Sequence, residues 1–299
     1  MALWFRQFHR WIALAFALPL IVVIFTGLVL SVEPWVVTQH IQPGSLTADK
    51  VQALLRQHDP EGKARSLSFR SYDQALTISA GRGENVIVHT ASGSVQPAPS
   101  SLAATFTSMR RLHEHLLFDA GWLVIASTGA MLALALLGVL MGWPKFANSL
   151  AGWHKAVAWI GLPLLVLSPL TGMFLATSLS FSGPPPAEAK AGKPPKLMEA
   201  VRIVGERHDL SSLVWLRARR GMLLARLVED GEYKVYAVTT KGTVAMPRNW
   251  PRLWHEGNFA GAWSAGMNLL ISLAMVFLLG SGLWIWFSRQ RRLRSRRIA

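Results

Sequence analysis

The chain has 299 residues, of which 51% are apolar, and it carries a formal net charge of +15 and no cysteine. The lack of cysteine excludes disulfides, thiolate ligands, iron–sulfur clusters and covalently attached c-type haem, so a bound metal would need histidine, methionine or carboxylate ligands. The apolar residues gather in long runs, which indicates a membrane protein, and nucleic-acid binding is not needed to explain the charge.

Four apolar stretches are each long enough to cross a bilayer as a helix. About 20 apolar residues, at a rise of about 1.5 Å per residue, cover a hydrocarbon core of roughly 30 Å. None of the four carries Asp, Glu, Lys or Arg in its middle. The predicted transmembrane helices are 1–32, whose apolar part begins at Trp11, and 121–143, 153–177 and 263–287. The first is predicted to be an uncleaved helix rather than a signal peptide, because 30–34 lacks an A-x-A-like cleavage site.

Two long polar segments, 33–120 and 178–262, are each predicted to fold as a small α+β domain. Each contains a helical pattern followed by three strand-like runs. In the first, the helix is expected at 47–57, with Thr47 as its N-cap, and the strands at 64–70, 74–79 and 85–90. In the second, the helix is expected at 196–207 and the strands at 212–217, 222–228 and 233–239, with Asp230-Gly231 as a hairpin turn.

The charge distribution predicts how the helices are oriented. The segments 1–32, 121–176 and 263–299 carry ten basic residues, Lys145 among them, and no acidic one, whereas all 16 acidic residues lie in the two long segments. By the positive-inside rule, both termini and the 144–152 loop are expected in the cytoplasm and both α+β domains on the outer side. The basic tail, 288–299, is expected to anchor this topology and to contact anionic lipid.

A histidine recurs at one end of every predicted span, at matched distances from matched glycines. His9 lies 17 residues before Thr26-Gly27 and His154 lies 17 residues before Thr171-Gly172, while His113-Glu114 lies 25 residues before Gly138 and His255-Glu256 lies 25 residues before Gly280. This recurrence predicts a membrane α-helical fold whose four transmembrane helices form a tandem 2+2 repeat.

The four histidines are candidate haem ligands. A lone histidine at a helix end is more often solvated or bonded to backbone, but the repetition favours a shared task. If the halves pack around a pseudo-twofold axis along the membrane normal, His9 and His154 converge near the cytoplasmic face and His113 and His255 near the outer face. Two neutral imidazoles are the axial ligands of a six-coordinate haem iron, so the sequence predicts two non-covalent b-type haems.

Other residues near the histidines have two interpretations each. The glycines could make room for flat macrocycles or allow close helix packing; these are Gly27, Gly129, Gly138, Gly172 and Gly280. The basic side chains beside the outer histidines could attract an anionic substrate or bind lipid headgroups; these are Arg110, Arg111, Arg248 and Arg252. Glu114 and Glu256 are expected to be solvated or to face a substrate, because adjacent helix residues point apart.

The chain resembles the PepSY-associated transmembrane proteins over nearly its whole length. The resemblance rests on Phe8-His9-Arg10-Trp11 with Pro19, on Phe25-Thr26-Gly27, on Glu33-Pro34-Trp35 and on Gly152-Trp153-His154-Lys155, together with the helix-plus-strands segments. Members with this four-helix layout are similar to bacterial inner-membrane reductases that use bound haem to release iron from ferric siderophores. The resemblance therefore implies PepSY-like periplasmic domains and a di-haem oxidoreductase with a ferric siderophore as its substrate.

No cytoplasmic segment is long enough to fold as a flavin or nicotinamide domain, so the expected electron donor is a quinol or a separate reductase. The alternative function is a non-enzymatic membrane anchor whose PepSY-like domains bind a peptide or a protease. A metal or proton-coupled transporter is disfavoured, because ionisable residues in the middle of the membrane usually mark such pathways and the predicted spans lack them.

Overall fold

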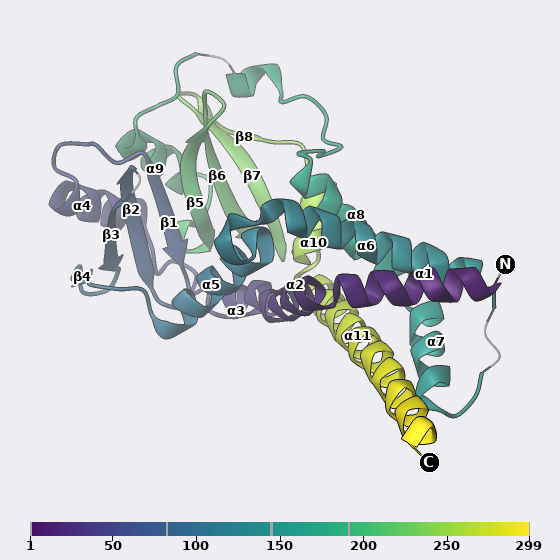
Figure 1. Ribbon diagram of the computed structural model, residues 1–299. Coiled ribbons are helices and arrows are strands. Elements are labelled where there is room, and N and C mark those ends of the chain that lie inside the picture. The colour runs from purple at the N-terminus through teal and green to yellow at the C-terminus, as the bar shows by residue number, and fades with distance from the viewer. Residues whose placement is uncertain (1, 82, 144–145, 191, 299) are drawn as a thin grey trace.

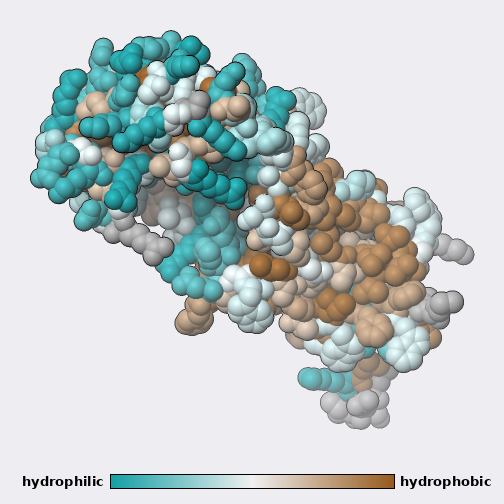
Figure 2. All heavy atoms as spheres, turned by 90° about the horizontal axis from the view of Figure 1, so that it is seen from above, coloured by the Kyte–Doolittle hydropathy of each residue, from teal (hydrophilic) through white to brown (hydrophobic). Residues whose placement is uncertain are grey.

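The computed structural model describes residues 2–298 except 82, 144–145 and 191, so Lys145 lies outside the described residues. Helices form a bundle with a β-sheet at one end, and α1 begins and α11 ends at the opposite end (Figure 1). Apolar side chains gather over the bundle and hydrophilic ones over the sheet (Figure 2). This partition is the one expected of a helical membrane region that carries a water-exposed domain.

The elements of the first half follow one another in a simple order. They are α1 (Ala2–Ala15), α2 (Ala17–Leu30), α3 (Glu33–Gln39), α4 (Ala48–His58), β1 (Ser66–Arg70), β2 (Ala75–Gly81), β3 (Glu84–His89), β4 (Val95–Gln96), α5 (Ser101–His115), the 3-10 turn η1 (Leu117–Asp119) and α6 (Gly121–Leu140). Helix α4 begins after Thr47, whose side chain accepts a hydrogen bond from the Lys50 N–H, so the expected N-cap is present.

The second half has the same order of helices and strands, with two added 3-10 turns. It comprises α7 (Leu150–Ile160), α8 (Leu162–Ala176), η2 (Ala187–Lys190), α9 (Leu197–Gly205), η3 (Leu210–Ser212), β5 (Leu213–Arg219), β6 (Met222–Glu229), β7 (Glu232–Thr239), β8 (Gly242–Ala245), α10 (Trp250–Glu256) and α11 (Gly261–Ile298). The expected turn at Asp230-Gly231 has positive φ at both residues, as a type I′ hairpin requires. The short strands β4 and β8 were not predicted.

Among the described residues, three helical stretches are long and apolar enough to cross a membrane: Ala17–Gln39, Gly121–Leu140 and Gly261–Ser295. A fourth span is possible if α7 and α8, which meet at an angle of 66°, are counted as one. The last helix continues through the basic segment as far as Ile298, so the tail expected after 287 is an extension of α11.

The first helix of each half is broken, whereas continuous helices were expected at 1–32 and 153–177. The breaks fall at Phe16, between α1 and α2, and at Gly161, between α7 and α8. Each break lies just before a proline, Pro19 or Pro163. Proline has no N–H to donate to the carbonyl four residues earlier, and its ring clashes with that carbonyl. His9 and His154 therefore lie on separate helices, α1 and α7.

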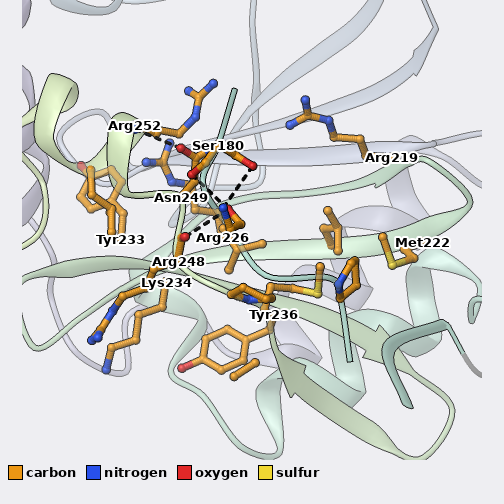
Figure 3. A pocket seen from close by; sticks show the side chains of 18 of the residues that line it. Ser180, Arg219, Met222, Arg226, Tyr233, Lys234, Tyr236, Arg248, Asn249 and Arg252 are labelled. Carbon is orange, nitrogen blue, oxygen red and sulfur yellow. Dashed lines mark hydrogen bonds between the residues drawn. The ribbon is translucent and has the colours of Figure 1, made fainter. Parts of the chain in front are cut away.

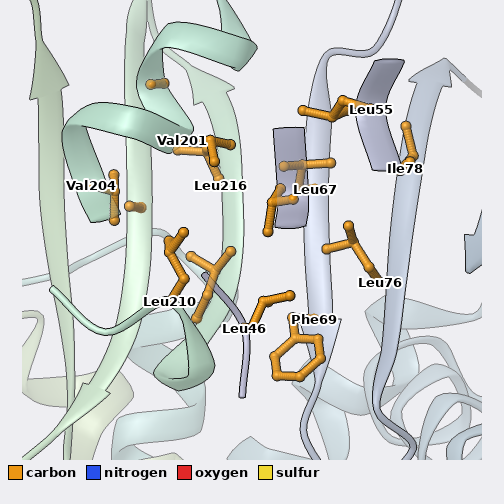
Figure 4. Close-up of a cluster of buried hydrophobic side chains, with 14 of the residues drawn as sticks. Leu46, Leu55, Leu67, Phe69, Leu76, Ile78, Val201, Val204, Leu210 and Leu216 are labelled. Atoms are coloured by element: carbon orange, nitrogen blue, oxygen red, sulfur yellow. The ribbon is translucent and has the colours of Figure 1, made fainter. Parts of the chain in front are cut away.

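The two α+β units expected as separate domains share one antiparallel sheet of strand order β4-β3-β2-β1-β5-β6-β7-β8 within the described residues. Strand β1 pairs with β5, with Leu67 opposite Leu216. Separate units would leave β1 and β5 with unpaired edges, so their pairing satisfies the backbone of both. Leu67 and Leu216 lie at the centre of a core formed by both units, under α4 and α9 (Figure 4).

Helix packing follows the same correspondence between the halves. Helix α1 contacts α6 and α7 contacts α11, while α2 contacts α5 and α8 contacts α10. Two further contacts cross between the halves, α6 with α8 and α11 with α2. These crossed contacts bring α5 and α10 to the middle of the bundle, just below the sheet.

Candidate functional site

The clearest candidate site lies where α5 and α10 meet. We call His113 of α5 and His255 of α10 the sheet-side histidine pair. Their ring centroids are 6.0 Å apart and their planes are tilted by 40°. These two residues are 142 positions apart in the chain, and the structure brings them face to face in the interior of the bundle.

Each ring of the sheet-side pair is held through its Nδ1 atom. His113 Nδ1 lies 3.0 Å from the Val23 carbonyl and 3.1 Å from Thr26 Oγ1 of α2. His255 Nδ1 lies 3.1 Å from the Ser168 carbonyl of α8, with Thr171 Oγ1 at 3.4 Å. Since a carbonyl only accepts, this network assigns the proton to Nδ1 in both rings. The Nε2 lone pair of each ring is then free to bind a metal, and neither Nε2 makes a hydrogen bond within the described residues.

Two glycines allow these rings to approach the helices. A Cβ atom at Gly27 would lie 3.2 Å from Cε1 of His113, and one at Gly172 would lie 2.9 Å from Cε1 of His255. Of the other glycines named from the sequence, Gly129 faces the Met173 methyl at 3.9 Å, and a Cβ at Gly138 or Gly280 would meet nothing within 4 Å among the described atoms. The Thr-Gly pairs that the repeat preserves thus position the histidine rings directly.

We call His9 of α1 and His154 of α7 the far-side histidine pair, because both lie toward the end of the bundle away from the sheet. The two rings are close enough for their charges to interact. His154 Nδ1 lies 2.8 Å from Ser281 Oγ of α11, and its Cε1 faces Gly282. His9 Nδ1 is buried without a hydrogen bond in the described part of the chain, beside the Leu134 backbone of α6. A buried nitrogen without a partner is costly unless a ligand occupies it.

Ser281 and Gly282 are site residues that the sequence analysis missed. The spacing comparison matched Gly280 with Gly138, but in the structure Gly282 lies against the histidine ring. The backbone neighbours of the far-side rings, Leu134 and Leu278, are 144 residues apart, which pairs Gly138 with Gly282. The signal was present in the sequence as a second glycine two residues further along, and it was hidden because the connection before α11 is two residues longer.

An ion-pair network lies directly beside His255. Glu256 accepts from Arg226 of β6 at 2.7 Å, from Arg252 at 2.5 Å and from the Asn258 amide at 2.7 Å. Burial alone would raise the pKa of the Glu256 carboxyl, but the two guanidinium groups outweigh that effect and hold this pKa at about 2. Glu256 is therefore a structural anion that ties α10 to the sheet, and the expectation of a solvated or substrate-facing side chain was wrong.

The four arginines proposed to attract a substrate are all engaged in ion pairs. Arg110 is paired with Glu33, Arg248 with Glu232 at 2.6 and 2.8 Å, and Arg252 with Glu256. Arg111 lies 3.8 Å from Asp119, and both of these side chains are 73% exposed. Exposed pairs of this kind contribute little, so Arg111 alone among the four remains available to a ligand.

The sheet-side pair matches the donor set of a haem better than that of a bare metal ion. No group of three or more His, Cys, Asp or Glu side chains that could hold a metal ion occurs among the described residues. An imidazole–metal bond of about 2 Å, with about 1 Å more to the ring centre, places the centroids of two opposed ligands roughly 6 Å apart. The observed 6.0 Å separation fits two axial imidazoles on one iron.

The fold and the site together define an α-helical membrane protein with buried histidine pairs and a PepSY-sized α+β sheet at one end. Residues 6–289 match the model of the PepSY-associated TM region family, so the chain belongs to that family. No match is found among the curated proteins.

Proposed function

We propose that this protein is a haem-dependent oxidoreductase of the bacterial inner membrane that reduces a ferric siderophore on the periplasmic side and so releases its iron. The observation that carries the proposal is the sheet-side pair: two imidazoles 6.0 Å apart, each anchored at Nδ1 by a carbonyl. Haem b, when bound, supplies reversible one-electron chemistry at its iron. The proposal includes two such groups, one at each histidine pair.

The chain's own residues orient the ligands. The Val23 and Ser168 carbonyls fix the tautomer of His113 and His255, and Gly27 and Gly172 set how deeply the rings lie. Ser281 holds His154 in the same way at the far-side pair. Rings fixed in advance need no rearrangement when the charge of a bound iron changes, which suits an electron-transfer site.

We also propose that the halves are a tandem 2+2 repeat with both termini in the cytoplasm and the sheet in the periplasm. The proposal is supported by the ten basic residues of the helical segments and by the 16 acidic residues of the two long segments. The protein would then connect a cytoplasmic-side donor, a quinol or a separate reductase, to a periplasmic acceptor. One electron converts Fe³⁺ to Fe²⁺, which the hard anionic oxygens of a siderophore hold far less strongly, so the iron is released from the intact chelator.

The visible spectrum of protein purified in detergent from haem-replete cells tests the proposal. We expect a reducible, six-coordinate low-spin spectrum with two haems per chain. Changing His9 or His154 to alanine should alter one haem signal, and changing His113 or His255 should alter the other. His89→Ala, which removes an exposed histidine of β3, is the matched control and should alter neither.

A colourless preparation would exclude the electron-transfer function and favour the non-enzymatic anchor with peptide- or protease-binding domains. Loss of both signals from each single change, in protein that remains folded, would contradict the assignment of one pair to each haem.

A further inference from the structure

A cavity of about 650 Å³ lies on the face of the sheet opposite the shared core, in the second half only as far as the described residues show. It is bounded by β5, β6 and β7, by α10, and by the segment 178–183 that follows α8 (Figure 3). Its size is within the range of about 300–1,000 Å³ that small-molecule sites occupy.

The lining of this cavity is strongly basic. Seven cationic side chains, from Arg217 of β5 to Arg252 of α10, line it together with a single acidic residue, Glu232. Glu232 is already bound by both guanidinium nitrogens of Arg248. The cavity therefore contains no free carboxylate to balance the remaining positive charge.

Three of these cations, Arg217, Arg219 and Arg220, make no ion pair within the described part of the chain. The Arg217 guanidinium lies over the Trp215 ring at 4.3 Å. Burial, together with repulsion from Arg219, lowers the pKa of Arg217, which shows that positive charge has accumulated here without compensation.

The floor of the cavity is formed by Arg226, whose side chain is 10% exposed. One of its terminal nitrogens binds Glu256, and its guanidinium lies over the Tyr233 ring at 4.7 Å. Its Nε has no hydrogen-bond partner in the described structure. A buried charged donor without an acceptor is unfavourable, and an anionic ligand in the cavity would supply the acceptor.

The first half lacks these side chains at the corresponding places in the sheet. Leu67 pairs with Leu216 across the junction of the two units, so Ser66 and Ser68 of β1 correspond to Trp215 and Arg217 of β5. Through the neighbouring register, in which Leu67 faces Ile78 and Leu216 faces Ala225, Ser79 of β2 corresponds to Arg226 of β6. The histidines are alike in both halves, but aromatic and cationic side chains line only the second.

We propose that this cavity is the docking site of the substrate and that it selects a polyanionic, aryl-bearing ferric chelate of the tris-catecholate type over a neutral one. The identity of the ligand as a substrate rests on the proposed function above. Arginines stacked on Trp215 and Tyr233 provide both flat apolar surfaces for aryl rings and charged donors for catecholate oxygens.

The location suits delivery to the sheet-side pair. Arg252 lines the cavity one helical turn before His255, and Glu256, which binds both Arg226 and Arg252, directly follows that histidine. A chelate held by this wall lies beside α10, the helix that carries one of the two proposed ligands.

Gallium(III) chelates test binding without electron transfer, because gallium(III) is not reduced under conditions that reduce iron(III). We would measure binding of a gallium tris-catecholate and of a neutral gallium trihydroxamate to the full-length protein in detergent by equilibrium dialysis. We expect the tris-catecholate to bind at least ~10-fold more tightly, and this preference to decrease as salt is raised. Inorganic phosphate in tenfold excess should not displace it.

Arg217→Ser and Arg219→Ser install small polar side chains like those of the first half at exposed positions. Each change should weaken tris-catecholate binding by ~10-fold and leave trihydroxamate binding unchanged. Arg56→Ser, on the exposed face of α4 outside the cavity, is the matched control and should have no effect.

Equal binding of the two chelates, displacement by phosphate, or full retention of binding in the Arg217→Ser, Arg219→Ser double variant would overturn the docking proposal. The assay needs no haem, so the two proposals fail separately. A colourless protein that binds the tris-catecholate in the cavity refutes only the reductase function, and a haem-containing ferric reductase without this preference refutes only the docking site.

Discussion

At the scale of single residues, the sheet-side pair depends on side chains that are absent as much as on those that are present. Gly27 and Gly172 leave the space into which the His113 and His255 rings fit. The adjacent threonines, Thr26 and Thr171, return their hydroxyls to their own helices, and these oxygens then lie beside the histidine Nδ1 atoms. A helix thus provides a hydrogen-bond acceptor and a gap at neighbouring positions.

Gly172→Ala is expected to disturb the sheet-side site alone. The new methyl group would lie 2.9 Å from His255 Cε1, so the ring must move by several tenths of an ångström away from α8. We expect an altered spectrum of the haem at this pair and a stability loss of about 1–3 kcal/mol from overpacking. Gly280→Ala on α11, where a Cβ meets nothing within 4 Å among the described atoms, is the control. Equal effects of the two substitutions would show that the close approach of Gly172 has no special role.

At the scale of elements, two prolines divide the first helix of each half and so determine where the far-side histidines lie. His9 and His154 belong to α1 and α7, which precede the breaks, and the rest of each stretch continues as α2 or α8 toward the sheet. A continuous helix from 153 to 177 would place His154 on the axis of α8 instead of against Ser281 of α11.

Pro163→Ala is expected to reduce the 66° bend between α7 and α8, because alanine restores the N–H donor for the Trp159 carbonyl. The chain has no native cysteine, so spin labels on Ala151→Cys and Ala176→Cys report this distance cleanly. Full straightening would lengthen the separation by about 6 Å at a rise of 1.5 Å per residue. Pro169→Ala, inside α8, should leave the distance unchanged. An unchanged distance in Pro163→Ala would show that tertiary packing, and not the missing donor, maintains the bend.

At the scale of the whole molecule, the two halves are joined twice. The crossed contacts α6 with α8 and α11 with α2 join them in the bundle, and β1 with β5 joins them in the sheet. The shared core under α4 and α9 makes the sheet region one cooperative unit. Each pair of histidines combines one member from each half, so this joining is what assembles the proposed sites.

Leu216→Ala is expected to destabilise both halves of the sheet together. The side chain is fully buried beside Leu67, and its truncation should cost about 2–5 kcal/mol. Hydrogen exchange should therefore accelerate in β2 as well as in β6. Val95→Ala, at an exposed position in β4, is the control and should change exchange little. Acceleration limited to β5–β8 would mean that the two units unfold independently.

The sequence by itself determined the apolar stretches, the secondary structure of the two long segments and the residues of both histidine pairs. These features follow from local rules: hydropathy over about 20 residues, alternation in strands, and a repeat whose spacing is written in the chain. The family resemblance stated from short motifs at His9 and His154 was confirmed over residues 6–289.

Only the tertiary structure decided how far apart His113 and His255 lie, that Gly282 rather than Gly280 faces a histidine, that Glu256 is an internal anion, and that the two units share one sheet. It also placed Trp215, Arg217 and Arg226 around one cavity. The physical reason is that each of these depends on contacts between segments some 10 to 150 residues apart. Such contacts are set by how helices and strands pack, and spacing along the chain does not encode packing directly.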